Sequence, residues 1–456
     1  MIAGEHVPDE TRIYAWIEEV FAQGVRRPGY PADRWAEQWA QERFRAFGLE
    51  RVRAEPVDMH SWEPEETSLL VRGDDGAEID APCFALPHCA RTDGLDARLM
   101  AYDADAPERV RGAISLYDMP LVRVPHGYYR HIATWTFDPD GSFDDGWQMV
   151  PFGREFQDAM EPSMAAGAIG FVGVLREYPG DSFQYYVPYD GKERAVPGVW
   201  ISGSDGVRVR AMLAAGRVQA RVVVRARRER ITSYNIIGEL AGADDETVII
   251  GSHHDGPWSS AVEDASGVAM VLAQAAYWSR VPDRERPHRL TFLLNAGHMA
   301  GGAGQFAFVQ SHAADLERLV LELHLEHAAN EFAEVDGVLR ATGRPEARWW
   351  FTSRIERLEA AVRGAIEAED LRRSYILPPD AFGPKPTTDA ADFYPAGVPV
   401  VNFLVAPFYL FDAMDTLDKI DRPGLVPITR AAIRIVESTA GVSAAQFRQE
   451  DRRRPA

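Results

Sequence analysis

The segment 251–267, GSHHDGPWSSAVEDASG, concentrates side chains that could bind a metal ion. His253 and His254 offer imidazole nitrogens, and Glu263 and Asp264, which begin ten residues after His253, offer carboxylate oxygens. Zinc, manganese and iron all accept such a mixed set of nitrogen and oxygen ligands. We therefore expect a metal site here, with Glu263 and Asp264 as alternative ligands.

The elements around this segment would place it at one edge of a sheet. The apolar run 248–250 predicts a short buried strand, and the apolar run 268–278 predicts a helix that begins after Ser266-Gly267. A strand, a polar loop and a helix in this order are typical of α/β proteins, which bind ligands at the carboxyl ends of their strands.

The rest of the second half repeats this alternation. Apolar runs predict further strands at 233–240, 290–294, 319–325 and 398–405, and further helices at 304–312, 358–367 and 426–439. Strands that alternate with helices indicate an α/β fold with a doubly wound, mainly parallel sheet. We expect the tail 446–456 to be disordered.

The first half has a different texture. Two helices are predicted within 12–47, broken at 27–31, followed by separate strands at 51–57 and 68–71. Short β segments then dominate 95–225, including a strand at 219–224. The aromatic-rich insertion 121–157 is either a long loop that packs over something or a satellite core, and the sequence leaves both open.

Composition excludes some partners. The 456 residues carry 69 acidic and 49 basic side chains, a net charge of −20, which disfavours nucleic acid and anionic membranes. No run approaches the roughly 18 apolar residues of a membrane span, and no targeting segment is visible. Cys83 and Cys89 are too few for a disulfide framework, so we expect a cytoplasmic protein with reduced thiols, and a homo-oligomer is possible.

Taken together, these motifs resemble the co-catalytic zinc aminopeptidase family that includes glutamate carboxypeptidase and the transferrin receptor. The resemblance implies a peptidase-like domain (1–92 and 229–445), an inserted β-rich protease-associated domain (93–228) and a tail (446–456). The motifs that carry it are MAAGAIG at 164–170, PGVWIS at 197–202, TSYNIIG at 232–238, HHD at 253–255 with ASG at 265–267, TD at 388–389, and DTLDKID at 415–421.

The residues at the family's catalytic positions depart from its pattern. His253 matches the first ligand, but Glu263 stands at the bridging aspartate and Glu326 at a later aspartate ligand. The family's paired glutamates, a base and a ligand, fall on Gly297 and His298. Its last histidine ligand falls on Phe411.

These departures predict a single divalent ion, because phenylalanine cannot bind a metal. We expect zinc first, with manganese or iron as alternatives, held by His253, by Glu263 or Asp264, and by Glu326. His298 is predicted as a fourth ligand or a proton carrier. With the glutamate base absent, the candidate proton acceptors are His298, His254, Asp264 and His324.

The altered site suggests a specialised enzyme. We expect a metal-dependent hydrolase that cleaves an amide or related C–N bond with an activated water, such as a small-molecule amidohydrolase or a deaminase. The alternatives are a di-zinc aminopeptidase or carboxypeptidase acting on short peptides, and a non-catalytic binding protein. His327 is expected to be an ordinary surface or hydrogen-bonded residue, and Asp389 a turn residue. Two bound ions would instead indicate that Asp412 or Asp389 replaces the lost histidine.

Overall fold

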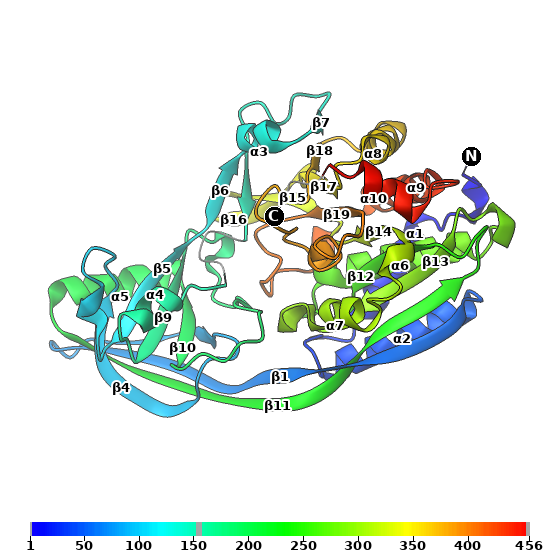
Figure 1. The fold of residues 1–456 in the computed structure, drawn as a ribbon. Helices are drawn as coiled ribbons and strands as arrows, with labels where there is room; N and C mark the ends of the chain where they lie inside the picture. Colours follow the sequence, from blue (N-terminus) through cyan, green and yellow to red (C-terminus); the bar gives the residue numbers. More distant parts are fainter. Residues whose placement is uncertain (1, 152–156, 453–456) are drawn as a thin grey trace.

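A computed structural model describes residues 2–151 and 157–452 and shows two lobes that share one sheet (Figure 1). In this part of the chain the sheet has 15 strands, in the order β3-β10-β9-β5-β4-β11-β13-β12-β14-β19-β17-β18-β7, with β1 and β2 attached beside β11. The strands from β13 to β18 form the larger lobe, and those from β3 to β4 form the smaller one.

A long antiparallel ribbon of β1 (Glu50–Gly73) and β11 (Val218–Leu240) runs through both lobes (Figure 1). The predictions of separate strands at 51–57 and 68–71, and at 219–224 and 233–240, are therefore wrong. The pattern of β1 is obscured because Pro64 and Glu66 flank a register shift, which breaks the alternation of side chains without ending the pairing. Strand β11 also continues without a break through residues 228 and 229, where the sequence predicted the inserted domain to end and the peptidase-like domain to resume.

The larger lobe confirms the mainly parallel α/β sheet. Its centre is made of parallel strands β13 (Arg289–Asn295), β12 (Thr247–His253), β14 (Leu319–Leu325) and β19 (Val400–Val405). Val248 and Ile250 join one buried cluster, whereas Ile249 joins another. Successive side chains of β12 thus feed opposite faces of the sheet, and both faces need cover.

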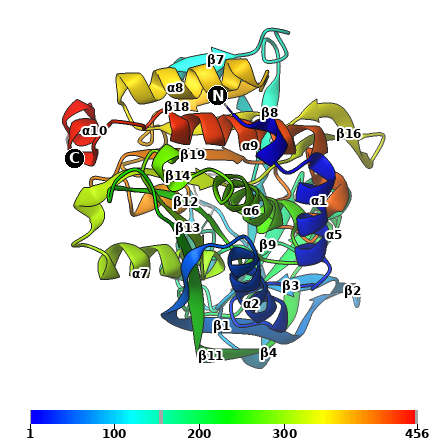
Figure 2. The ribbon, with the colours of Figure 1, turned by 90° about the vertical axis from the view of Figure 1, so that its right-hand side faces the viewer.

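Helices supply that cover. The first face packs against α1 (Glu10–Phe21), α6 (Gly267–Trp278), α8 (Glu356–Ala368) and α9 (Arg422–Glu437). The second face packs against α7 (Ala303–Ser311), and Figure 2 shows α7 and α9 on opposite sides of the central strands. Helix α2 (Pro31–Ala46) packs on β1, β11 and α6.

The smaller lobe extends the far end of the sheet. Its strands are β3 (Cys83–Ala85), β4 (Thr92–Ala101), β5 (Ile114–Pro120), β9 (Gly170–Arg176) and β10 (Gly198–Ser202), accompanied by α4 (Glu161–Ala165) and α5 (Gly203–Ala215). β2 (Glu78–Ala81) pairs with β1.

The aromatic insertion forms an arm between the lobes. It contains β6 (Val122–Pro125), α3 (His126–Ile132), β7 (Trp135–Phe137) and β8 (Trp147–Val150), while residues 152–156 lie outside the described chain. β7 pairs with β18 (Ser374–Leu377), which follows β17 (Arg348–Thr352) in the sheet. Tyr129 and Phe143 are buried against the larger lobe. The arm therefore forms a satellite core.

The predicted disorder of the tail is wrong for the described part of it. Helix α10 (Ala444–Glu450) follows a capping box between Ser443 and Gln446, and Phe447 is buried. A hairpin of β15 (Asn330–Val335) and β16 (Val338–Pro345) completes the main elements. No helix in the described ranges has the length and apolar composition of a membrane span.

Candidate metal centre

Three neighbouring parallel strands end at the same edge of the sheet and deliver polar side chains there. His253 is the last residue of β12, His298 lies in the turn after β13, and Glu326 comes directly after β14. β12 lies between the other two strands. The sequence predicted this edge as the site, and the structure brings these three residues to it.

Glu263 is the central carboxylate of the cluster. It lies in the turn Ala261–Ser266 before α6 and is fully buried. Its Oε1 is 3.3 Å from His253 Nε2 and 3.6 Å from His298 Nε2, and its Oε2 is 2.6 Å from His327 Nε2. Three imidazoles therefore surround one carboxylate.

Asp264 points its oxygens elsewhere. Its Oδ1 accepts hydrogen bonds from the backbone N–H of Gly267 at 3.0 Å and of His327 at 3.2 Å, and its Oδ2 accepts one from the Ser252 hydroxyl. Its closest approach to His253 Nε2 is 3.8 Å. The geometry thus presents Glu263 to the cluster and uses Asp264 to join the turn to its neighbours.

Four imidazoles share one orientation. Nδ1 of His253 lies 2.9 Å from the Asp255 carbonyl, and Nδ1 of His327 lies 2.8 Å from the Val405 carbonyl. Nδ1 of His324 and of His298 each faces a carboxylate instead. In all four rings Nε2 is left to face the cluster, which is how metal-binding histidines are commonly held.

Asp389 connects the two sides of the cluster. It begins a short helical turn, Asp389–Ala391, and its Oδ1 is 2.5 Å from His298 Nδ1. Its Oδ2 is 3.9 Å from Nε2 of His324, and that same Nε2 is 3.1 Å from Glu326 Oε1.

Several buried atoms of the cluster have no hydrogen-bond partner among the described residues. They are His253 Nε2, both Glu263 carboxylate oxygens, His324 Nε2, His327 Nε2 and Asp389 Oδ2. Buried polar atoms left in this way cost free energy unless a ligand satisfies them. His253, Glu263 and His327 hold ligand atoms within 4.8 Å of one another, and so do His324, Glu326 and Asp389. These donors fit a divalent transition-metal ion.

The imidazoles and carboxylates of the cluster shift one another's pKa values. Burial alone lowers the pKa of His298, but Asp389 outweighs it and raises the pKa to about 10. Burial also opposes protonation of His327, yet Glu263 raises its pKa to about 10. Conversely, burial raises the pKa of Glu263, but His327 and His253 hold it well below its ordinary value. Burial raises the pKa of Asp264 to about 6.

The structure places His254 outside the cluster. Its Nδ1 is 2.9 Å from Asp33 Oδ1 on α2, and its Nε2 is 3.0 Å from the Tyr234 carbonyl. Both ring nitrogens are therefore engaged away from Glu263, and His254 attaches the metal-binding loop to α2. The prediction that His254 accepts a proton in catalysis has no support in this geometry.

The backbone explains one departure from the family pattern. Gly297 adopts φ = +68°, where a side chain is strained, and a Cβ there would lie 2.7 Å from Met59 Cε. Asp255 accepts the backbone N–H groups of His298 and Met299 at 3.0 and 2.8 Å and so fixes this turn. The turn presents His298, and its left-handed backbone at position 297 disfavours a glutamate there.

Phe411, at the position of the family's last histidine, belongs to a stack of rings. Its ring centroid is 4.8 Å from that of Tyr189, which is 5.3 Å from that of His298. His298 in turn lies 4.1 Å from His253. Phe411 thus supports the imidazoles from one side by packing.

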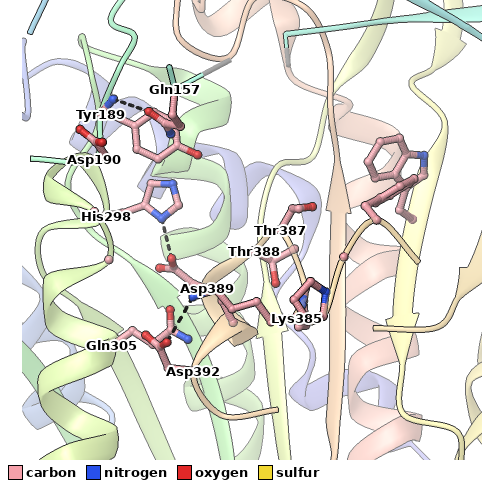
Figure 3. A pocket seen from close by; sticks show the side chains of 18 of the residues that line it. Gln157, Tyr189, Asp190, His298, Gln305, Lys385, Thr387, Thr388, Asp389 and Asp392 are labelled. Carbon is pink, nitrogen blue, oxygen red and sulfur yellow. Dashed lines mark hydrogen bonds and ion pairs between the residues drawn. The ribbon is translucent and has the colours of Figure 1, made fainter. Parts of the chain in front are cut away.

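A cavity of about 880 Å³ opens onto this cluster (Figure 3). His298 and Asp389 form part of its lining, and Figure 3 shows Tyr189 next to His298 and Gln157 beside Tyr189. Most of the wall is apolar and comes from the arm and the larger lobe: Val124, Tyr128, Tyr129, Val150, Trp349 and Phe382. The arm therefore also packs over a cavity at the metal centre, as the first of the two interpretations of the insertion predicted.

Sequence reasoning gave too little weight to His327 and Asp389. His327 has φ = +52°, and its Nε2 lies 2.6 Å from Glu263, although the residue directly follows Glu326 in the sequence. The available signal was the HLEH pattern at 324–327 directly after a buried strand. Asp389 comes from a separate connection before β19, so nothing local could place it beside His298.

Comparisons with known proteins agree with this architecture. Residues 235–436 match the sequence profile of Peptidase family M28. A peptidase M28 precursor from Shewanella amazonensis SB2B is similar in structure, with 22% identity and a TM-score of 0.71 over 98% of this chain and 96% of that chain. An aminopeptidase from Aneurinibacillus sp. strain AM-1 gives 21% identity and a TM-score of 0.64 over 94% and 93%.

A zinc aminopeptidase from Bacillus subtilis gives 18% identity and a TM-score of 0.66 over 94% of this chain and 95% of that chain. At these identities the structural likeness establishes the fold. The comparison with curated proteins gave no match.

Proposed function

Because residues 235–436 match the sequence profile of Peptidase family M28, we propose that this protein is a metal-dependent hydrolase specialised for an amide or related C–N bond of a small molecule with a flat apolar group. One observation carries the proposal. Imidazole Nε2 atoms and buried carboxylates with unsatisfied polar atoms converge beside His298 and Asp389, which line a largely apolar cavity.

In this proposal His253, Glu263 and His327 hold the ion. Their donor atoms are two nitrogens and a carboxylate, and the backbone carbonyls of Asp255 and Val405 orient the two rings. Three protein ligands are typical of catalytic zinc sites, which keep another position for water or substrate. A divalent ion bound there supplies a polarised substrate carbonyl and a nucleophilic water at neutral pH.

His298 is the proton carrier in this mechanism. Its Nδ1 is fixed by Asp389 at 2.5 Å, its Nε2 faces Glu263 at 3.6 Å, and it lines the cavity. Asp389 stabilises the charged imidazole and raises its pKa to about 10, so His298 would give its Nε2 proton to the leaving nitrogen and regain a proton from water afterwards. This role replaces the glutamate that Gly297 cannot provide.

The cavity favours a substrate without a free α-ammonium group. Its acidic lining residues are Asp190, Asp389 and Asp392, and each already faces a cation or an imidazole. Arg194 holds Asp190 at 2.7 and 3.0 Å, His298 holds Asp389, and Lys385 lies 3.6 Å from Asp392. An ammonium would therefore compete with existing pairs, whereas a flat ring would pack on Tyr128, Tyr129 and Trp349.

The test compares two amide series on protein reconstituted with Zn²⁺. N-acyl anilides, which lack an ammonium group, are expected to be cleaved faster than anilides of free amino acids. Ammonia release from exocyclic amines is measured in parallel to detect deamination. Chelation should abolish turnover, and added Zn²⁺ should restore it.

The variant His298→Gln separates the proton carrier from the ligands. We expect it to keep its metal content and lose at least about 100-fold in kcat, as removal of a general acid–base group does. Preference for free amino-acid anilides would replace the proposed substrate class with that of an aminopeptidase. A folded chain that takes up no Zn²⁺ would overturn the enzymatic proposal as a whole.

A further inference from the structure

We infer that the chain binds a second divalent ion at a separate subsite made of His324, Glu326 and Asp389. This inference rests on the proposed function in treating the cluster as a metal centre, but it uses different side chains. Neither His324 nor Asp389 stands at one of the ligand positions matched to the family in the sequence. The sequence predicted one ion because Phe411 removes a ligand.

His324 is built to present one nitrogen to this subsite. The residue is fully buried on β14, and its Nδ1 is 2.8 Å from Glu322 Oε1. Its Nε2 lies 3.1 Å from Glu326 Oε1 but has no hydrogen-bond partner of suitable geometry in the described chain. Gly251 on the adjacent strand makes the room, because a Cβ there would be 3.2 Å from Nδ1.

Asp389 presents an oxygen from the opposite side. Only its Oδ1 is engaged by His298, and Oδ2 is buried without a partner among the described residues. Oδ2 lies 3.9 Å from His324 Nε2. One carboxylate can therefore orient His298 for catalysis and at the same time serve an ion on its other face.

A proton on His324 is the competing explanation, and charge argues against it. Glu322, Glu326 and Asp389 all approach this one imidazole to within 4 Å. In the described ion pairs no lysine or arginine faces any of the three carboxylates. His298 already pairs with Asp389, so a proton on His324 would still leave one of the three carboxylates without a counter-charge and Asp389 Oδ2 without a partner, whereas a divalent ion would supply both.

Phe411 explains why a second ion would use this side. Its ring stacks on Tyr189 and so fills the flank of His298 with apolar groups. His253 stacks on the other face of the His298 ring, so a nitrogen and an oxygen for a second ion come from the Nδ1 edge, where Asp389 and then His324 lie. The two subsites would then share the neighbourhood of His298 and open toward the same cavity.

Metal stoichiometry and anomalous scattering of the full chain test the inference. The protein is stripped with chelator, reloaded with Zn²⁺, dialysed and analysed for bound metal, and crystals are measured at the zinc edge. We expect two equivalents and two peaks, one of them beside His324 and Asp389. Glu326→Gln, which keeps the shape of the side chain, is expected to reduce the content from two to one.

Two further variants assign the loss to a subsite. His324→Ala should remove only the second peak, and His327→Ala should remove only the first. His312→Ala is the matched control, since this histidine pairs with Glu55 away from the cluster and should keep both ions. Thermal melting confirms that each variant is folded.

The outcomes separate this inference from the proposed function. One equivalent at His253, Glu263 and His327, with content unchanged by Glu326→Gln, overturns the second subsite and leaves the hydrolase proposal standing. Two equivalents that both survive Glu326→Gln and His324→Ala also overturn it. No bound zinc in a folded chain overturns both.

Discussion

At the scale of single residues, Glu263 and Asp264 are adjacent in the sequence, but their carboxylates have different surroundings. Glu263 faces three imidazoles and has no hydrogen bond from the described backbone, whereas Asp264 accepts two backbone N–H groups and a hydroxyl. The sequence could not choose between them, because both carboxylates have the same chemistry and adjacent positions. The turn geometry decides which one reaches the cluster.

This difference predicts opposite results for two conservative substitutions. Glu263→Gln should weaken Zn²⁺ binding at least about 100-fold, because it removes the charge that the ion and the imidazoles require. Asp264→Asn should leave zinc affinity within about tenfold, since the amide oxygen can still accept from Gly267 and His327. Competition with a chromogenic chelator measures both affinities. Equal losses in the two variants would contradict the assignment.

At the scale of elements, the spacing of apolar residues predicted the strands and helices that are determined by the local sequence. The strands and helices of the larger lobe follow from apolar runs such as 248–250 and 268–278, and His253, His298 and Glu326 follow because parallel strands end at one edge. The continuity of β1 was missed because its pairing with β11 comes from a segment about 170 residues away. Asp389 could be named only as an alternative to Asp412 for the same reason, since only the tertiary fold brings it to His298.

The connection between α1 and α2 shows such a long-range element at the metal centre. Arg26 is fully buried, and its guanidinium faces the carbonyls of His254, Ser259, Ser260 and Glu263. Four carbonyls from one loop gathered around one cation fix the path of that loop. Arg26 is thus a positioning residue for Glu263.

Arg26→Lys is therefore expected to loosen the loop. A lysine ammonium cannot reach all four carbonyls, so we expect unfolding free energy to fall by at least about 2 kcal/mol and zinc affinity by about 10- to 100-fold. Arg34→Lys, at an exposed position on α2, is the control and should change neither quantity. Urea unfolding and zinc titration provide the readouts. Loss of stability with unchanged zinc affinity would limit Arg26 to a structural role.

At the scale of the whole molecule, the arm lets the smaller lobe shape the cavity of the larger one. β7 extends the sheet beside β18, and the connected residues Tyr128 and Tyr129 reach the cavity wall. The residues of the metal centre belong to the larger lobe, whereas part of the cavity wall is formed by residues of the arm. Substrate selection and metal binding should therefore be separable by mutation.

Tyr128→Ala tests this separation. The ring lines the cavity and is 48% exposed, so its removal should raise KM for aryl amides about tenfold with little change in metal content or melting temperature. Trp147→Ala is the matched control, because this residue lies on the same arm, is 44% exposed and does not line the cavity. A similar rise in KM in both variants would point to a general effect on the arm.

The free energy of unfolding should depend on pH through the buried carboxyl group of Glu346, which is not one of the proposed metal ligands. Glu346 is buried and accepts the N–H of Ala347 at 2.9 Å; burial, reinforced by Glu331, raises its pKa from 4.5 to about 7. The folded chain therefore binds a proton more tightly than the unfolded chain. The stabilising contribution is complete below pH 4.5 and is lost as the pH rises through 7, by about 3 kcal/mol in total.

Glu346→Gln should consequently be more stable than the wild type at pH 8, by up to about 3 kcal/mol, with the difference vanishing near pH 4.5. Glutamine preserves the acceptor for Ala347, so the substitution removes the ionisation and keeps the hydrogen bond. Urea unfolding across this pH range measures the difference, and Glu285→Gln at an exposed site should give a flat one. A Glu346→Gln difference that does not grow with pH would show that Glu346 ionises in the folded protein as readily as in the unfolded chain.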